Sequence, residues 1–582
     1  MRNGAVAGWR LARKSAQRKE GKDTMLTYAL NRTARESLYE QLYRALRFDI
    51  ESGALGAGDR LPSKRAFAKH LGVSVVTVEG AYDQLVAEGY VRAVPRSGFY
   101  VQEIGPNLAS FSRVSTSVEV KVPLGDSSGA KSASCRPEAR ISGNDGVEKL
   151  EKLARKGAPF CIAHIEEGLA GVSPGAGRKW LADFTGATAP EGVFPYAAWA
   201  RTLRRVLADE SERTVLEASG PQGSSRLRAA IAAHLRGFRG MEVHPDQIVI
   251  GSGAQSLYGL LVQLLGRNLA YGVEDPGYPR LTRIYESNDV AVRPIALDGE
   301  GPVLEALERA RIDVLHCTPS HQFPTGITVP VSRRRSLLEW AQSGVAAPED
   351  GAAAREIRGR SVKASSARSR YLIEDDFDCE FRMAGRPVPP LAALDGAGRV
   401  IYANTFSKTL GGAFRIGYMV LPEALAERFR DRLGFYACTV GALEQLTLAR
   451  FMESGDYERH VNRQRTRYRR RLSALIDALA ASSAGDHLHF ANAGAGLHFL
   501  MEARGVEGDE RGGVTFEERV ARRAAIRGVR LAPLGRYRFT GCEAGWRHPA
   551  FMMSFSSVKE ETIPEVVGIV SEAVMAEVGC RS

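Results

Sequence analysis

The stretch NTFSKTLGGAFRIGY, residues 404–418, sets Lys408 between two hydroxyl residues and places Arg415 seven positions later. A lysine becomes chemically special when its amine is kept partly deprotonated, because the free amine can form an imine with an aldehyde. The aldehyde cofactor that uses a lysine in this way in α/β proteins is pyridoxal 5'-phosphate (PLP). It also needs an anion site, a carboxylate at the pyridine nitrogen, an aromatic face and a partner for its phenolic oxygen. If Lys408 has this role, the rest of the chain must supply these features.

A site for the phosphate is predicted by IVIGSGAQSLYGLLVQLL, residues 248–265, which reads as a strand, a Gly-rich turn and a helix. Unpaired backbone N–H groups at a helix start bind anions. Hydroxyl groups beside the lysine and the guanidinium fork of the arginine add further donors. The residues expected to bind the phosphate are Gly253, Ala254, Gln255, Thr405, Ser407 and Arg415.

The ring of the cofactor would be held by two further strand ends. YLIEDDFDCEF, residues 371–381, is an apolar strand that ends in acids, and Asp375 would keep the pyridine nitrogen protonated. VEDPGYP, residues 273–279, ends another strand and offers Tyr278 to the face of the ring. Each motif alone is common and is usually structural or exposed. Their occurrence together, in chain order and at strand ends, is much more specific.

Composition limits the class of protein. The 582 residues exceed one ordinary core and predict two or more domains. Apolar residues make up 44% and charged residues 25%, and no run of about 18 apolar residues offers a membrane span. The 7 cysteines are scattered without a CxxC pair, which favours a reducing cytoplasm over a disulfide scaffold or a metal site. The net charge of +12 suits nucleic acid, although charge alone is weak support.

Composition also changes along the chain. Residues 1–25 form a basic lead without the apolar core of a secretion signal, and we expect them to be disordered. Residues 26–102 have helical periodicity, and residues 103–178 are expected to be a linker rich in Ser, Gly and Pro. Residues 179–582 alternate apolar strands with amphipathic helices, the pattern of an α/β domain with a largely parallel sheet. Within it, residues 344–370 are expected to form a disordered insertion.

The N-terminal segment predicts a helix-turn-helix. In LPSKRAFAKHLGVSVVTVEGAYDQLVAEGYV, residues 61–91, the apolar positions mark two helices broken at LGVS, with Ser63 and Ser74 placed to cap them. GYVRAVPRSGFYV, residues 89–101, then predicts a β-hairpin wing with a basic tip. A second helix held in this way can enter a major groove. The plainer alternative is a small helical domain without a ligand.

The order of these landmarks closely resembles the GntR-type winged helix-turn-helix, which implies binding to a double-stranded DNA operator. Where the family commonly has arginine after the serine of the second helix, this chain has Val75, and in the wing Val94 replaces an arginine while Arg96 is new. We therefore expect a different operator, with Val75 able to contact a thymine methyl. The DNA-binding residues that the resemblance implies are Ser63, Arg65, Ser74, Thr77, Arg96, Ser97 and Gly98.

The larger segment is similar to fold-type-I aminotransferases. Besides the motifs above, GPQGSSRLRAAIAAHL at 220–235 and TPSHQFPTG at 318–326 stand in the order of that family. Behind a GntR-type domain, SHQFPTG, EDDFDCEF and TFSKTL more narrowly resemble the MocR/GabR-type regulators. The resemblance implies an α/β fold class, with an N-terminal winged helix-turn-helix domain and a PLP-dependent transferase fold-type-I (aspartate aminotransferase-like) domain. It further implies a homodimer, Lys408 as the imine lysine, and Arg280 at an effector carboxylate.

Three positions depart from the fuller aminotransferase pattern. Ala218 and Phe377 stand where tyrosines are usual, and Met552 stands where an arginine grips the substrate carboxylate. Each lost hydrogen bond to a charged group is worth about 1.5–3 kcal/mol, so cofactor binding would weaken without being abolished. Efficient transamination suffers more, because a substrate without a carboxylate clamp is not held with its reacting bond aligned.

Three functions are compatible with these features. The first is a transcriptional regulator in which an amine, an amino acid or the cofactor itself reaches Lys408, and the change passes through the linker to two winged helices of a dimer. The second is an active aminotransferase that carries a DNA-binding domain. The third is a regulator that has lost the cofactor and keeps the fold as a dimerisation scaffold.

Overall fold

The structure is a computed structural model that describes residues 26–102 and 179–578 except for short gaps. The gaps are residues 29, 32–36, 52, 88–89, 95–96, 188–189, 345–355, 358–359, 362–368, 384–387, 495, 507–513 and 540–547. The predicted lead, the predicted linker and Arg96 lie outside the described residues. The chain divides into two compact units, Met1–Asn107 and Leu108–Ser582, and each is described by itself.

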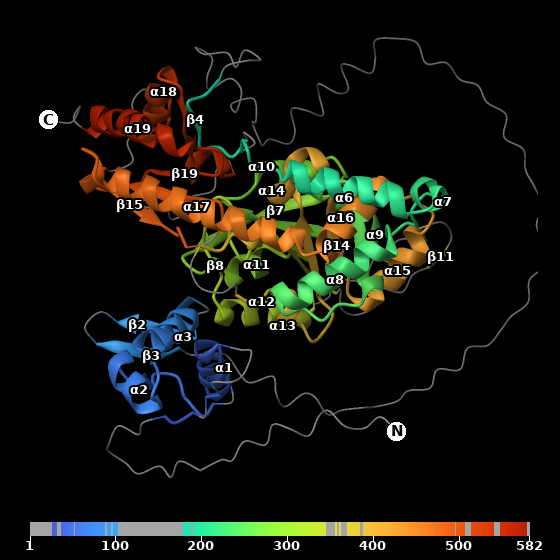
Figure 1. The fold of residues 1–582 in the computed structure, drawn as a ribbon, viewed down its shortest axis with the longest axis horizontal. Coiled ribbons are helices and arrows are strands. Elements are labelled where there is room, and N and C mark those ends of the chain that lie inside the picture. Colours follow the sequence, from blue (N-terminus) through green and yellow to red (C-terminus); the bar gives the residue numbers. More distant parts are fainter. Residues whose placement is uncertain are drawn as a thin grey trace, which may run out of the picture. The chain divides into compact units, whose positions relative to one another are not determined.

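The N-terminal unit is a winged helix-turn-helix (Figure 1). Ser63 begins the second helix because its side chain accepts a hydrogen bond from Ala66 N, and Gly72, with φ +64°, ends it. The predicted hairpin wing is present, and a two-residue strand adds a third member to its sheet in the order β1-β3-β2. The elements are α1 (Leu38–Glu51), β1 (Arg60–Leu61), α2 (Lys64–Leu71), α3 (Val75–Ala87), β2 (Val91–Val94) and β3 (Gly98–Val101).

The C-terminal unit is built on an eight-stranded sheet in the order β5-β14-β13-β12-β9-β6-β7-β8. Neighbours from β13 through β7 are parallel, whereas β14 is antiparallel to both β13 and β5. Its central strands are mostly buried, as expected of a sheet covered by helices on both faces. The strands are β5 (Ile248–Gly251), β6 (Ala270–Asp275), β7 (Ala291–Asp298), β8 (Gly301–Pro302), β9 (Val314–Cys317), β12 (Tyr371–Asp375), β13 (Val400–Thr405) and β14 (Gly417–Val420).

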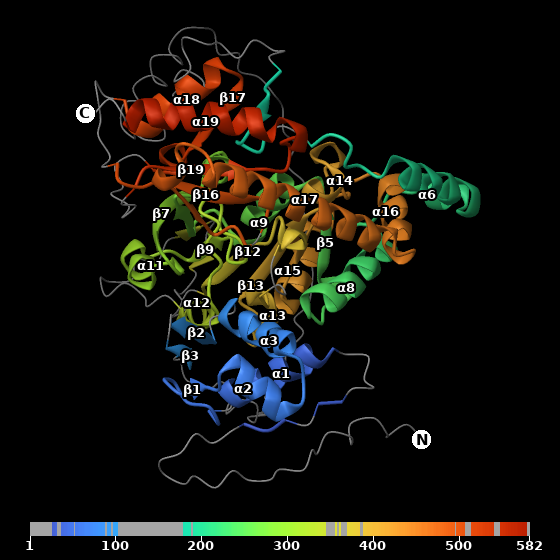
Figure 2. The same cartoon turned by 60° about the vertical axis from the view of Figure 1, so that its left-hand side comes forward.

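Helices cover both faces of this sheet (Figures 1 and 2). One apolar cluster packs α9, α10 and α15 against the strands. A second cluster includes residues of α8 and α16, and a third includes residues of α11 and α12. The helices are α6 (Tyr196–Asp209), α7 (Glu212–Leu216), α8 (Ser225–Arg239), α9 (Ala254–Leu265), α10 (Pro279–Glu286), α11 (Leu304–Ala310), α12 (Val331–Ser343), α13 (Leu391–Leu394), α14 (Ser407–Leu410), α15 (Glu423–Leu433) and α16 (Ala442–Glu453).

A second sheet, in the order β15-β16-β19-β18, follows the long helix α17. It packs with α17, α18 and α19 around the largest apolar cluster of the described chain. The elements are β4 (Ala182–Asp183), α17 (Asp456–Ala480), β15 (Leu488–Ala491), β16 (His498–Ala503), α18 (Phe516–Ile526), β17 (Val529–Arg530), β18 (Ala532–Pro533), β19 (Ala550–Ser554) and α19 (Ile563–Val578). The 3-10 helices are η2 (Pro245–Gln247), η3 (Cys379–Phe381), η4 (Gly412–Phe414), η5 (Gly485–His487), η6 (Leu534–Tyr537) and η7 (Glu560–Thr562).

Within the predicted insertion, β10 (Glu356–Ile357) and β11 (Arg360–Ser361) form a short antiparallel pair, and most of the remainder lies outside the described residues. None of the helices in the described ranges combines the length and apolar character needed to cross a membrane.

Candidate cofactor site and DNA interface

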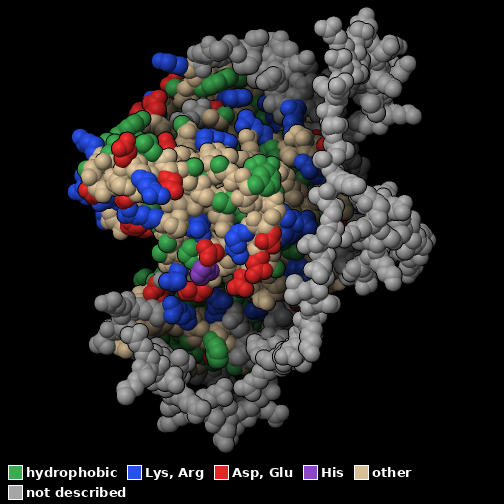
Figure 3. Space-filling view, turned by 90° about the vertical axis from the view of Figure 1, so that its right-hand side faces the viewer, with side chains coloured by type: hydrophobic (Ala, Val, Ile, Leu, Met, Phe, Trp, Pro, Cys, Tyr) green, Lys and Arg blue, Asp and Glu red, His purple; other side chains and the backbone are tan. Residues whose placement is uncertain are grey.

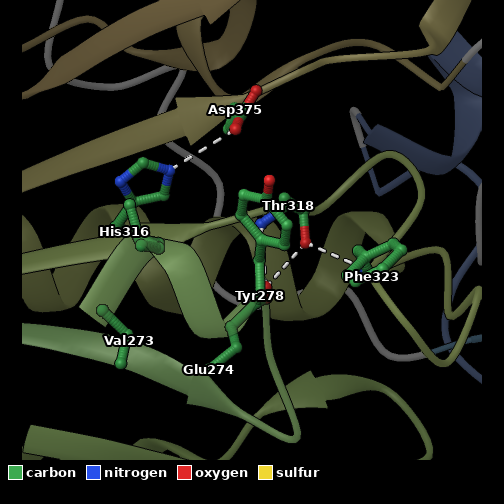
Figure 4. Close-up of a pocket in the computed structure, with 8 residues that line it drawn as sticks. Val273, Glu274, Tyr278, His316, Thr318, Phe323 and Asp375 are labelled. Atoms are coloured by element: carbon green, nitrogen blue, oxygen red, sulfur yellow. Dashed lines mark hydrogen bonds and ion pairs between the residues drawn. The ribbon is translucent and has the colours of Figure 1, made fainter. Parts of the chain in front are cut away.

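Three consecutive acids at the end of β12 are separated by the alternation of side chains along a strand. Glu374 Oε1 lies 3.5 Å from Arg334 Nη1, and Asp376 Oδ2 lies 2.8 Å from Arg239 Nη2. All four side chains are buried. The alternation leaves Asp375 on the opposite side, where it lines a pocket (Figure 4). The two buried ion pairs therefore fix the strand end and aim one carboxylate into the pocket.

Only one of the two carboxylate oxygens of Asp375 has a hydrogen-bond partner among the described residues. Its Oδ2 accepts a hydrogen bond of 2.5 Å from the Tyr258 hydroxyl, and His316 Nε2 lies 3.7 Å from the same oxygen. Burial, followed by the charge of Asp375, raises the pKa of Tyr258 well above its usual value, so this phenol stays protonated and donates. The other oxygen, Oδ1, is buried and has no hydrogen-bond partner among the described residues. An unpaired carboxylate oxygen here fits the protonated nitrogen of a pyridine ring.

Lys408 is in the short helix α14, directly after β13. Asp375 on β12 pairs with Ala403 on β13, so the lysine and the aspartate lie at the same edge of the sheet. Burial lowers the pKa of Lys408 below its usual value, and the charge of Asp378 opposes this shift. In the part of the chain that the structure describes, Lys408 Nζ makes no hydrogen bond or ion pair. Its amine is therefore suited to nucleophilic attack on an aldehyde.

Strand register brings the predicted phosphate site together. Gly417 on β14 pairs with Gly251 on β5 and with Thr405 on β13, which sets the turn before α9 beside the lysine segment. Gly253 begins α9 with φ +77°, and a Cβ added there would lie 3.1 Å from the Arg415 guanidinium carbon. The exposed Arg415 thus lies against the start of α9. Ala254 and Gln255 form the first turn of that helix, and Ser407 begins α14.

Tyr278 stands at the mouth of the pocket, immediately before α10. Its side chain is 45% exposed, and its ring meets Phe323 edge-on with 5.7 Å between ring centroids. Arg280, in the first turn of α10, is also exposed. The pocket is lined by Val273, Glu274, Tyr278, Leu281, His316, Thr318, Phe323 and Asp375, which come from β6, β9, β12 and the segments that follow them.

These residues fit PLP in chemical type. Lys408 supplies an amine of lowered pKa, and Asp375 supplies a buried, unpaired carboxylate oxygen. Gly253 and Arg415 supply helix-start N–H groups and a guanidinium for a phosphate. All four lie where ligands bind in open α/β sheets, beyond the carboxyl ends of the parallel strands.

The three departures from the aminotransferase pattern have distinct surroundings. Phe377 packs near Phe323, with 6.3 Å between ring centroids, so two apolar rings flank this end of the site. Met552 is buried in the middle of β19, opposite Leu500 on β16, and offers no cation to a carboxylate. Ala218 is exposed.

Several residues of the site were not predicted from the sequence. Tyr258 on α9, His316 on β9 and Tyr285 on α10 form a chain of contacts to Asp375, with 2.7 Å between Tyr285 Oη and His316 Nδ1. The position of His316 in an otherwise apolar strand was a signal for a buried polar role. Tyr258 carried no such signal, because an aromatic residue on an amphipathic helix is usually core.

A buried cluster links the central sheet to the C-terminal sheet. His321 Nδ1 lies 3.0 Å from Asp378 Oδ2, which also accepts a hydrogen bond of 3.1 Å from Leu497 N. His498, at the start of β16, packs against His321 with 4.0 Å between ring centroids. A Cβ added at Gly496 would lie 1.7 Å from His321 Nδ1 and 2.6 Å from Asp378 Oδ2, so the backbone at Gly496 is in close contact with the His321–Asp378 ion pair. We therefore interpret the cluster as a structural contact between these two sheets of the C-terminal unit.

The N-terminal unit presents the predicted DNA-binding residues on α2, α3 and the wing. Ser74 caps α3 by accepting a hydrogen bond of 3.1 Å from Thr77 N, and Arg65 is exposed on α2. At the start of α3, Val75 is 42% exposed and Val76 is 74% exposed. The end of the recognition helix that would meet base edges is therefore apolar.

The wing contains an arginine that the sequence analysis missed. Arg60 donates a hydrogen bond of 2.6 Å to Ser97 O, and a Cβ added at Gly98 would lie 3.3 Å from Arg60 Nε. Gly98 has φ +126°, a conformation that favours glycine. Arg60 is exposed and lies across the hairpin, where a cation can reach a phosphate.

Comparisons with known families agree with this division. Residues 38–101 match the family described as bacterial regulatory proteins, gntR family, and residues 190–506 match aminotransferase class I and II. Solved aminotransferases share the fold of the larger unit. A multiple substrate aminotransferase from Thermococcus profundus has a TM-score of 0.58 at 21% identity, covering 75% of this chain and 100% of its own. A Thermus thermophilus aspartate aminotransferase variant has a TM-score of 0.53 at 20% identity, covering 72% and 98%.

Relatives that span both units are regulators. The HTH-type transcriptional regulator YdeL of Bacillus subtilis is 31% identical over 82% of this chain and 86% of its own length. The probable rhizopine catabolism regulatory protein MocR of Rhizobium meliloti is 29% identical over 88% and 89%. The pyridoxine biosynthesis regulator PdxR of Corynebacterium glutamicum is 29% identical over 94% and 98%. The chain therefore belongs to the MocR/GabR-type transcriptional regulators, in which a GntR-type winged helix-turn-helix precedes an aminotransferase class I and II domain.

Proposed function

We propose that this regulator binds PLP at Lys408 and changes its binding to operator DNA when an amine, an amino acid or the cofactor itself reaches that site. The observation that carries the proposal is the convergence of Lys408, Asp375 and the Gly253–Arg415 seat at one sheet edge, in a chain that also has a GntR-type domain. When bound, PLP would supply an aldehyde that reacts reversibly with amines.

The residues of the site would divide the work of holding the cofactor. Lys408 would hold the aldehyde covalently and Asp375 would hold the proton of the pyridine nitrogen through Oδ1. Tyr258 supports that role because its hydroxyl donates a hydrogen bond to Oδ2 and so orients the carboxylate. Arg415 and the start of α9 would bind the phosphate, and Tyr278 would cover one face of the ring.

The effector would be recognised chiefly by its amine. Met552 leaves no arginine at the position that grips the carboxylate of an aminotransferase substrate. Arg280 is an exposed cation close to Tyr278 at the pocket mouth, and it would attract a carboxylate carried farther from the amine. An effector bound in this way would compete with Lys408 for the aldehyde and release the lysine.

A homodimer is part of the proposal. Tyr196, Leu216 and Phe435 are 75%, 74% and 77% exposed, and a dimer interface would cover side chains of this kind. Figure 3 shows hydrophobic side chains between charged ones on the side of the molecule that carries α7 in Figure 1. Two copies would present two recognition helices to two half-sites. We further propose a cytoplasmic location, because a regulator of this class acts on DNA.

The test uses the full-length chain. Purified protein with added PLP should develop the visible absorption band of a lysine-bound cofactor, and Lys408→Ala should lack it while still binding the operator. Candidate amines and amino acids, including ones without an α-carboxylate, should then change both the band and the affinity for an operator found near the chain's own gene. Absence of the band in the wild type would favour a regulator that has lost the cofactor.

A second candidate function is transamination. The retained Lys408 and the unpaired Asp375 oxygen favour it, whereas Met552 opposes it. Single-turnover conversion of the bound cofactor to its amine form by an amino acid would support the enzyme. Reversible spectral change without that conversion would support the sensor.

A further inference from the structure

Three buried polar atoms in the lining of the pocket have no hydrogen-bond partner among the described residues. They are Asp375 Oδ1, His316 Nε2 and Glu274 Oε1. Asp375 is assigned above to a pyridine nitrogen, and His316 is tied to Tyr285 and lies beside Asp375. Glu274 has no role in the function proposed so far, although it is only 5% exposed and lines the same pocket (Figure 4).

The two oxygens of Glu274 have very different surroundings. Oε2 accepts hydrogen bonds of 2.6 Å from Thr318 Oγ1, 3.2 Å from Thr318 N and 3.2 Å from Gln322 Nε2. The Thr318 hydroxyl also accepts a hydrogen bond of 3.2 Å from Phe323 N. The Thr318 N–H and the Gln322 amide group can only donate to Oε2, and the Thr318 hydroxyl donates to it as well, so a proton is favoured on Oε1 over Oε2.

A neutral Glu274 would consequently carry its proton on Oε1, the oxygen without a partner. Burial, partly offset by the hydrogen bonds from Thr318 and Gln322, raises the pKa of Glu274 to about 7. The titratable groups around it are Asp375 on β12, His316 and Cys317 on β9, and Tyr278 before α10. The negative charge of Asp375 adds to the rise. A buried donor without an acceptor is costly unless a ligand satisfies it.

We propose that Glu274 binds the ring ligand directly, by donating a hydrogen bond from protonated Oε1 to an acceptor atom on that ring. The inference rests on the proposed binding of PLP, whose ring carries a phenolic oxygen as such an acceptor. Phe323 and Phe377 flank this end of the site and offer it no donor. Glu274 and Asp375 then have opposite roles, since Glu274 donates a hydrogen bond to the ring ligand and Asp375 accepts one from it.

The experiment measures PLP affinity of the full-length protein by absorbance or fluorescence titration between pH 6 and 8.5. Glu274→Gln keeps an oxygen for Thr318 and Gln322 and places an N–H where Oε1 was, so it mimics the protonated acid at every pH. Above pH 7 the wild type should lose affinity relative to Glu274→Gln, approaching about tenfold per pH unit, because ionisation removes the donor. Near pH 6 the two should agree within about twofold. Glu274→Leu should bind about tenfold or more weakly at pH 6.

The controls separate this inference from the proposed function. Thr318→Val removes a donor to Oε2 and leaves Oε1 in place, so it should still lose affinity as the pH rises, with the midpoint moved to higher pH because the hydrogen bond that it removes lowers the pKa of Glu274 in the wild type. Thermal unfolding of each variant reports whether it is folded. If the wild type does not bind PLP, the proposed function is wrong. If the wild type binds PLP and Glu274→Gln shows the same pH profile, or Glu274→Leu binds as tightly as the wild type, only the role of Glu274 is wrong.

Discussion

Replacing Asp375 by asparagine tests the assignment of the pocket most directly. The substitution keeps the size of the side chain and an oxygen for the Tyr258 hydroxyl, which now lies 2.5 Å from Oδ2. It removes the negative charge from the unpaired oxygen that faces the pocket. A ligand whose ring nitrogen must stay protonated therefore loses its counter-charge, while one that binds elsewhere is unaffected.

The magnitude follows from the burial of this carboxylate. Its side chain is 17% exposed, so water screens the interaction only partly. A hydrogen bond to a charged group is worth about 1.5–3 kcal/mol, which corresponds to about one to two powers of ten in affinity. We expect Asp375→Asn to weaken PLP binding by about tenfold to a hundredfold at neutral pH.

The assay is a titration of the full-length protein with PLP, followed by its visible absorption. Asp431→Asn on the exposed surface of α15 makes the same change of charge at a residue that does not line the pocket, and it serves as the matched control. Operator binding without effector should be unchanged in both variants, which reports an intact winged helix. If Asp375→Asn binds PLP within about twofold of the wild type, Asp375 does not hold the pyridine nitrogen.

Three further changes test other parts of the argument. Gly253→Ala should weaken PLP binding by about tenfold in the same titration, because φ +77° disfavours alanine and its Cβ would lie 3.1 Å from the Arg415 guanidinium. Since burial lowers the pKa of Lys408, its free amine forms at lower pH than that of an ordinary lysine, and the rate of cofactor attachment should reach its plateau at lower pH than for free lysine. Arg239→Ala should destabilise the protein by about 3–5 kcal/mol in urea unfolding, because the charge of Asp376 is left buried without its ion-pair partner; an unchanged midpoint would contradict this.

The fold and the anchors of the site were predictable because their signals are local. A Gly-rich turn after a strand, acids at a strand end and a lysine after another strand each mark a position along the chain. Parallel strands then bring such positions to one edge of the sheet. The caps at Ser63 and Ser74 were equally local, since each needs only its own hydroxyl and the backbone N–H three residues later.

The interactions that tune the site were not predictable in the same way. Tyr258 and Asp375 are 117 residues apart, and the local sequence around either residue does not predict a contact with the other. The strand β1 has only two residues, too few for a period-two pattern, and forms because Arg60–Leu61 meets Phe99–Tyr100 in the folded wing. The proton on Glu274 depends on three donors that converge on one oxygen, which is a property of the assembled loop.

Relative to the aminotransferase pattern, this site keeps residues expected to bind the cofactor and lacks a residue expected to speed the reaction. Three features would bind the cofactor: covalent attachment, a phosphate site and a counter-charge at the pyridine nitrogen. Each would stabilise the bound cofactor equally in the ground state and in the transition state of a reaction. The arginine replaced by Met552 acts differently, because it orients a substrate for a particular bond change and contributes mainly to rate. Under the proposed function, a chain that retains the first group and loses the second would keep a reversible reaction with amines and would give up efficient turnover. With a GntR-type domain in the same chain, a long-lived bound state would then be the useful outcome, since the occupancy of Lys408 would have to persist long enough to change binding at the operator.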